Sequence, residues 1–176
     1  MEKPTKILSD EHQNILKVIN AILKECDGLQ AGKPLDSNFF AKVIDFIRNY
    51  ADKFHHAKEE DILFVELCKD TVLMHCNPVE QMLHEHDLGR NFVKDTEDAL
   101  KDGITEKVIE NARGYAYLLQ DHIFKEDNIL YPMADQALNQ SIQDLMINKF
   151  QEAEAKRFNP GVKEKYISLA EEFKNR

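Results

Sequence analysis

Two histidines stand side by side in the stretch FHHAKEEDIL (residues 54–63), and each is followed four residues later by a glutamate. Residues four apart lie on the same face of an α-helix, so each pair can present an imidazole and a carboxylate to one partner. Imidazole and carboxylate groups together are suitable ligands for iron, manganese or zinc. The spacing therefore indicates a candidate metal site on a helix.

The neighbours of each pair predict which pair faces the interior. His55 and Glu59 continue the helical row of Ile44, Ile47 and Ala51, so they lie on the apolar face. The companions of His56 at helical spacing are polar, namely Asp45, Asn49, Asp52 and Glu60. We therefore expect His56 and Glu60 to form a surface pair, which a helix rotation of about 100° would be needed to bring into the site.

A second inward pair occurs near residue 120. His122 and Glu126 share a face with Tyr115 and Leu119. With 32 acidic residues in 176, one such pair could arise by chance, but two pairs on apolar faces of different helices are a stronger signal. Burying a carboxylate and an imidazole is costly unless each finds a partner, and a metal ion is such a partner.

Two further histidines lie at matching positions along their helices. His86 shares a face with Met82 and Val93, and His12 lies in the first helical segment. At about 1.5 Å per residue, His12 and His86 lie about 5 and 12 Å from the starts of their helices. His55 and His122 lie about 18 and 13 Å from the ends of theirs. In an up-down-up-down bundle these four ends are on one side, so the four imidazoles are expected at a similar height.

The periodicity predicts an all-α protein, because apolar residues recur at helical spacing and no alternating run indicates a strand. The first expected helix starts near Ser9 and ends by Gly28, and the second runs over 36–67. The third runs from an N-cap at Asn77 to 103, and the fourth runs from 105 to about 130, where Pro132 interrupts the pattern. Two weaker segments, 141–156 and 161–176, follow. We expect one domain over 1–176: an up-down-up-down four-helix bundle at about 7–134, and a C-terminal helical extension at 135–176 that packs on the bundle or makes a homodimer.

Composition excludes several partners. The formal charge is -9, and no run of Lys or Arg is present, which argues against nucleic acid and anionic membranes. No apolar run reaches about 18 residues, and the N-terminus has no apolar signal segment, so membrane spanning and export are not expected. Three cysteines without CxxC spacing fit reduced thiols, and we expect a cytoplasmic protein.

The chain resembles the hemerythrin-like family, also called HHE cation-binding domains, over roughly residues 7–134. The likeness rests on four motifs in order: LSDEH, FHHAKEEDILF, MLHEHDLGR and HIFKEDNILYPMA. The resemblance implies a four-helix bundle with a non-haem di-iron centre, in which Glu59 and Glu126 bridge the two irons. Carried over by position, the implied metal ligands are His12, His55, Glu59, His86, His122 and Glu126.

The sequence departs from the oxygen-carrying members of that family at two places. Those members have another histidine four residues before the position of His86, and here Met82 stands there; thioether is a poor ligand for a hard iron. Water, His75 or Glu60 could fill that position. They also have an aspartate five residues after the histidine of the fourth helix. Asp127 occupies that place here, so the second bridging carboxylate is open between Glu126 and Asp127.

The expected function is binding or sensing of a small ligand, namely dioxygen, nitric oxide or peroxide, or of iron itself. The resemblance implies two iron ions, with manganese or zinc as possible substitutes. One alternative is an enzyme that reduces peroxide or nitric oxide, with Tyr50 or Tyr115 assisting; another is a metal-free helical interaction module. The sequence reveals no pocket for a larger molecule.

Overall fold

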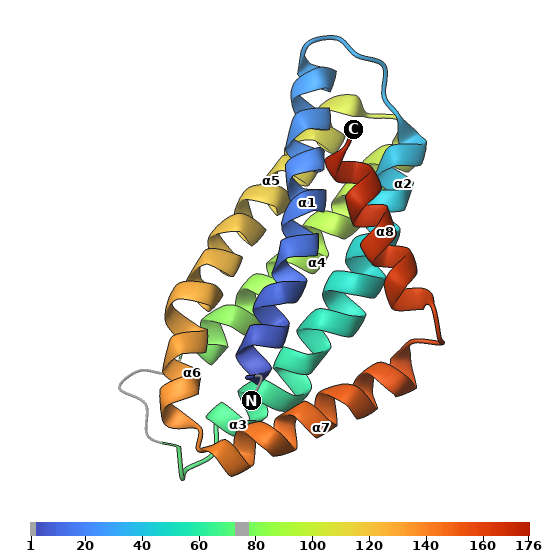
Figure 1. The fold of residues 1–176 in the computed structure, drawn as a ribbon. Helices are drawn as coiled ribbons and strands as arrows, with labels where there is room; N and C mark the ends of the chain where they lie inside the picture. Colours follow the sequence, from blue (N-terminus) through green and yellow to red (C-terminus); the bar gives the residue numbers. More distant parts are fainter. Residues whose placement is uncertain (1–2, 73–77) are drawn as a thin grey trace.

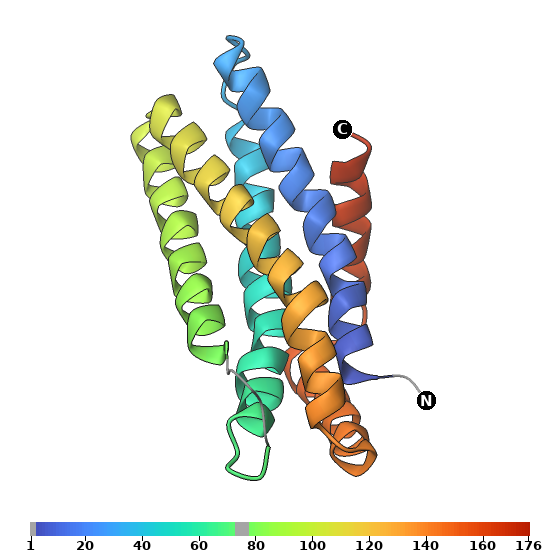
Figure 2. The same ribbon diagram turned by 90° about the vertical axis from the view of Figure 1, so that its left-hand side faces the viewer.

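Four long helical rods run antiparallel in the computed structural model, which describes residues 3–72 and 78–176 (Figures 1 and 2). The first rod is α1 (Pro4–Gln30). The second comprises α2 (Ser37–Phe46), η1 (Ile47–His56), η2 (Glu59–Leu63) and α3 (Phe64–Leu67). The third is α4 (Val79–Asp102), and the fourth comprises α5 (Thr105–Lys125), η3 (Glu126–Leu130) and α6 (Tyr131–Ala137). Residues 3–72 and 78–176 contain no strand, so the predicted all-α bundle is confirmed.

Local sequence explains where α2 begins and where α4 ends. The side chain of Asp36 accepts a hydrogen bond from the backbone N–H of Phe39 at 2.9 Å and caps α2. Gly103 ends α4 with φ at +68°, a left-handed conformation that glycine adopts without steric cost. The predicted N-cap Asn77 and the candidate ligand His75 lie outside the described residues.

Two predicted helix boundaries are wrong, and both involve a proline. The first helix begins at Pro4 rather than near Ser9, because a proline in the first turn loses no backbone hydrogen bond. The fourth rod continues through Pro132 to Ala137. The backbone hydrogen bonds change there from the π-helical pattern of η3 to the α-helical pattern of α6. Pro132 therefore falls within the first turn of a new α-helical segment, where no hydrogen bond from its nitrogen is needed.

Three segments of the second and fourth rods are π-helical: η1, η2 and η3. In a π-helix each N–H bonds to the carbonyl five residues earlier, so a turn holds more residues than in an α-helix. Successive side chains therefore rotate by less than the roughly 100° of an α-helix. Such segments are rare and often occur at functional sites.

The C-terminal helices pack on the bundle. α7 (Gln140–Arg157) crosses one end of the rods, and α8 (Val162–Lys174) lies beside α1 (Figure 1). Phe173 of α8 meets Phe39 edge-on, with ring centroids 5.2 Å apart. Met146 and Phe150 of α7 are buried in a core cluster with Leu63 and Phe64 of the second rod. None of the helices in the described part of the chain is long and apolar enough to cross a membrane.

Candidate metal centre

The six residues implied as ligands come together inside the bundle, and none is more than 2% exposed. Among the described residues, two neighbouring groups have ligand atoms close enough to hold a metal ion. One group comes from the first, second and fourth rods, and the other from the second, third and fourth. The groups are His12, His55, Glu59 and Glu126, and His56, His86 and His122.

The two glutamates connect these groups. Glu126 places Oε2 at 3.3 Å from Nε2 of His12 and Oε1 at 3.2 Å from Nε2 of His122. Glu59 places Oε2 at 3.6 Å from Nε2 of His55 and at 3.5 Å from Nε2 of His86. Each carboxylate therefore faces one imidazole of each group, which is the arrangement that two metal ions sharing bridging carboxylates would require.

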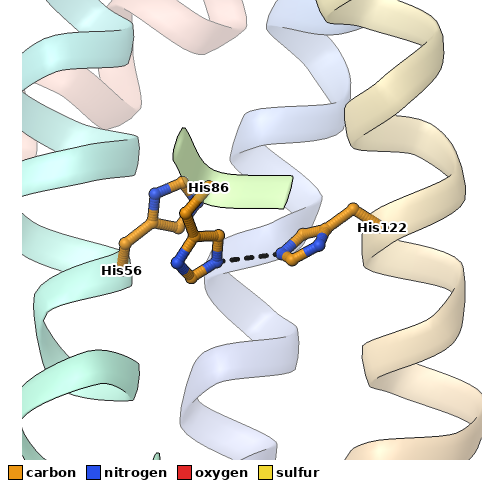
Figure 3. Close-up of side chains that lie close together, drawn as sticks. All are labelled: His56, His86 and His122. Carbon is orange, nitrogen blue, oxygen red and sulfur yellow. Dashed lines mark hydrogen bonds between the residues drawn. The ribbon is translucent and has the colours of Figure 1, made fainter. Parts of the chain in front are cut away.

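His56 is buried, at 6% exposed, so the prediction that it lies on a solvated surface is wrong. Its ring stacks on that of His86, with centroids 3.8 Å apart, and His122 completes the group (Figure 3). The cause is η1, which ends at His56. Because neighbouring side chains diverge less in a π-helix, His55 and His56 both point into the bundle.

A carboxylate lies at Nδ1 of every imidazole in the two groups. His12 is 2.9 Å from Asp127, His55 is 3.0 Å from Glu11, His86 is 2.7 Å from Glu60, and His122 is 2.8 Å from Glu85. His56 has Asp52 at a longer 3.6 Å. An Nδ1–H that donates to a carboxylate leaves the Nε2 lone pair free for a metal, and such outer carboxylates are a regular feature of metal-binding histidines.

The interior atoms of this arrangement lack the partners that burial requires. Nε2 of His55, Oε2 of Glu59 and both carboxylate oxygens of Glu126 are buried without a hydrogen-bond partner. The Nε2 atoms of His86 and His122 face each other at 3.0 Å (Figure 3). If both rings donate through Nδ1, two lone pairs oppose each other there. Bound cations would satisfy all of these atoms, so the residues present fit a metal centre.

Electrostatics lead to the same conclusion. Burial, together with the nearby Glu126, raises the pKa of Glu59 well above its usual range. Burial would also raise the pKa of Glu126, but the adjacent His122 and His12 lower it well below its usual range. The carboxylate of Glu59 is thus short of positive charge, which a metal ion would supply.

The sequence model of the hemerythrin HHE cation-binding domain family matches residues 3–134. The chain belongs to this family. No curated protein and no solved structure gave a significant match. The His and Glu groups of this HHE domain therefore fit the cation-binding character of its family, and the chain is a helical protein with a metal-binding site.

Two positions of this chain differ from the oxygen-carrying HHE proteins. Met82 is buried and belongs to neither group, and the imidazole of His56 lies with those of His86 and His122. Glu60, one of the replacements considered, lies behind His86 at Nδ1 rather than at Nε2. Glu126 lies in the group of His12, His55 and Glu59, whereas Asp127 contacts Nδ1 of His12.

Most of the outer carboxylates of this HHE domain are themselves paired with cations. Glu11 forms a buried ion pair with Lys58, which is 1% exposed. Lys125 pairs with Glu85. Arg90 reaches two of the carboxylates, at 2.7 Å from Asp52 and 2.6 Å from Glu60. These cations hold the carboxylates in place and offset their charge, which limits the cost of burying so many acids around the centre.

Sequence reasoning missed Tyr131, the tyrosine that touches the centre. Its hydroxyl donates to Oε1 of Glu59 at 2.5 Å, and its ring stacks on His12 with centroids 5.6 Å apart. Of the two tyrosines suggested as redox partners, Tyr50 instead accepts a hydrogen bond from Asn14. Tyr131 lies five residues after Glu126 in the motif HIFKEDNILYPMA, and that spacing along the rod was the available signal.

Proposed function

We propose that this HHE domain holds two iron ions between its two imidazole groups and binds or senses a small ligand: dioxygen, nitric oxide or peroxide. The observation that carries the proposal is the linkage by Glu59 and Glu126, since each carboxylate faces an imidazole of both groups. Two cations at these positions would share both carboxylates. Iron is the metal implied by the oxygen-binding relatives that the sequence resembles, and imidazole with carboxylate also suits manganese or zinc.

The ligand groups offer unequal numbers of donors. His56, His86 and His122 supply three imidazoles to one side, and His12 and His55 supply two to the other. With the bridging carboxylates, each ion would have fewer protein donors than the six positions of an octahedral site. Iron with an open position supplies reversible binding or reduction of small oxygen and nitrogen species.

The surrounding side chains prepare the site for such a ligand. The carboxylates at Nδ1 of four histidines fix the orientation of their rings, so that Nε2 points inward: His12, His55, His86 and His122. The hydroxyl of Tyr131 holds Glu59 by a hydrogen bond at Oε1 and leaves Oε2 directed to the imidazoles. Buried Met82 and Leu119 limit the entry of water.

Metal analysis and optical spectroscopy test the proposal. The full chain is loaded with Fe(II) without oxygen, desalted, and its iron content is measured. We expect about two iron ions per chain, and a change in the visible spectrum on exposure to air or nitric oxide. His12→Ala should reduce the iron content, while His84→Ala, at an exposed position of α4, should not. A chain that retains no iron would refute the proposal and favour the metal-free interaction module.

Peroxide separates a binding protein from an enzyme. One spectral change per iron pair, complete after a stoichiometric amount of peroxide, supports binding or sensing. Consumption of many equivalents while an electron donor is supplied to re-reduce the iron supports the alternative, an iron-dependent reductase of peroxide. Tyr131 gives this alternative a structural basis, because its phenol hydrogen-bonds a bridging carboxylate. Tyr131→Phe would then slow turnover while leaving the iron content unchanged.

A further inference from the structure

A cavity of about 320 Å³ lies beside the metal centre, between η1, α4 and α5. Its lining includes His56 and His86 of the candidate metal centre. The sequence revealed no pocket for a molecule larger than a diatomic ligand, because the cavity is lined by residues from three separate helical segments. A buried apolar cavity of roughly 150 Å³ accommodates benzene, so this one has room for a ring with a short substituent.

The walls of the cavity are mainly apolar. Ile47, Val93 and Leu119 line it, and each is buried. Gly89 leaves part of the space open: a Cβ added there would lie 3.6 Å from Cε2 of Tyr115, in ordinary van der Waals contact. Larger side chains at this position would extend into the cavity. The apolar lining favours an occupant with a hydrocarbon body.

The wall of the cavity includes a tyrosine whose buried hydroxyl lacks a hydrogen-bond partner. Tyr115 lines the cavity, is 3% exposed, and its hydroxyl has no hydrogen-bond partner. Burial and the nearby charge of Asp52 raise the pKa of this phenol, so it keeps its proton and can donate it in a hydrogen bond. A buried polar group without a partner is costly, and an acceptor oxygen placed in the cavity would remove that cost.

The charges around the cavity favour an uncharged occupant. Arg48 is paired with Glu97 at 2.9 Å, and Arg90 is paired with Asp52 and Glu60. Both arginines line the cavity, so their charges are already offset. Lys53, the third cation of the lining, is exposed to solvent. An anion would therefore find no buried cation to neutralise it.

We propose that this cavity binds a small, uncharged, mainly apolar organic molecule with one acceptor oxygen, which receives the hydrogen bond of the Tyr115 hydroxyl. The hydrocarbon part contacts Ile47, Val93 and Leu119, and the occupant lies next to the imidazoles of His56 and His86. This inference goes beyond the proposed function and does not depend on iron. It adds an organic ligand site next to a centre otherwise assigned to small inorganic ligands.

Three ring compounds of similar size test the proposal: cyclohexanone, methylcyclohexane and cyclohexanecarboxylate. Each is titrated into the full chain loaded with diamagnetic Zn²⁺, and the methyl NMR signals of Ile47, Val93 and Leu119 report binding. We expect saturable shifts at these methyl groups. Cyclohexanone should bind roughly three- to tenfold more tightly than methylcyclohexane, the contribution of one buried hydrogen bond. Cyclohexanecarboxylate should bind more weakly than cyclohexanone.

Matched tyrosine variants assign the hydrogen bond. Tyr115→Phe should weaken cyclohexanone roughly three- to tenfold and leave methylcyclohexane unchanged. Tyr117→Phe, at a 55% exposed position of the same helix, should change neither. Gly89→Val should prevent binding of all three compounds. Tighter binding of the carboxylate, an unchanged cyclohexanone affinity in Tyr115→Phe, or no saturable shift with any compound would each overturn the proposal. None of these results depends on whether the chain binds iron.

Discussion

Replacing His56 by alanine tests the most unexpected feature of the metal centre. The structure places this imidazole within the second ligand group, stacked on His86 and near His122. His56→Ala removes one of three imidazoles from that group. We expect the iron content to fall from about two to about one per chain, because the group of His12 and His55 is left intact.

The magnitude follows from the linkage between metal binding and folding. A metal present at 100 times its dissociation constant stabilises the folded chain by about 2.7 kcal/mol per site. For a chain of 176 residues, 1 kcal/mol corresponds to roughly 2–4 °C in Tm. Loss of one site should therefore remove about 5–10 °C of the metal-dependent increase in Tm.

Two opposing effects keep the stability of the metal-free His56→Ala variant close to that of the metal-free wild type. Truncation of His56 creates a small cavity next to His86, which destabilises the fold. It also removes Nδ1 of His56, a buried nitrogen without a hydrogen-bond partner, which offsets part of that loss. The difference between variant and wild type should thus be larger with metal than with a chelator.

The assay is thermal unfolding followed by circular dichroism, with and without metal, combined with metal analysis. His84→Ala is the matched control, since His84 is exposed on α4 and should change neither quantity. The reasoning is refuted if His56→Ala binds two metal ions and retains the full metal-dependent increase in Tm. That result would mean that His56 is buried without contributing to the centre.

Three further changes test the surroundings of the centre and the core. Glu85→Gln removes the charge behind Nδ1 of His122, and we expect metal affinity to fall about 10–100-fold in a competition titration with a chelator. Lys58→Met leaves the buried carboxylate of Glu11 without its cation, so urea unfolding should show a loss of about 3–5 kcal/mol, largely restored by adding Glu11→Gln. Burial raises the pKa of Cys26 from the ordinary 9.0 to about 11, so the folded chain holds this proton more tightly than the unfolded chain. The free energy of unfolding should therefore decrease as the pH rises from about 9 to about 11, and Cys26→Ala should reduce that decrease.

The sequence alone was sufficient for the fold and for most of the residues that the structure brings together at the candidate metal centre. Apolar residues at helical spacing predicted the four rods, and the apolar neighbours of His55 and His122 predicted two pairs that face inward. These inferences succeed because they depend on local periodicity, and an amphipathic helix has to bury its apolar face wherever it packs. The distances of His12 and His86 from the ends of their helices then predicted that both lie at the height of these pairs.

Tertiary structure decided which nitrogen and oxygen atoms meet. The burial of His56 depends on the π-helical turn of η1, and no spacing rule based on the α-helix predicts it. The carboxylates behind the imidazoles come from other rods in most cases, as with Glu11 behind His55 and Glu85 behind His122. The contacts between rods join residues 26 to 115 positions apart, so side-chain packing across helices determines them.

The cavity beside the candidate metal centre also depends on tertiary packing rather than on local sequence. Nothing in the local pattern around Tyr115 distinguishes it from a tyrosine whose hydroxyl is satisfied in the core. Only the packing of η1 against α4 and α5 leaves that hydroxyl without a partner and creates space beside it. Periodicity in a sequence reports which faces are buried, whereas empty volume and unpaired atoms arise from how several buried faces fit together.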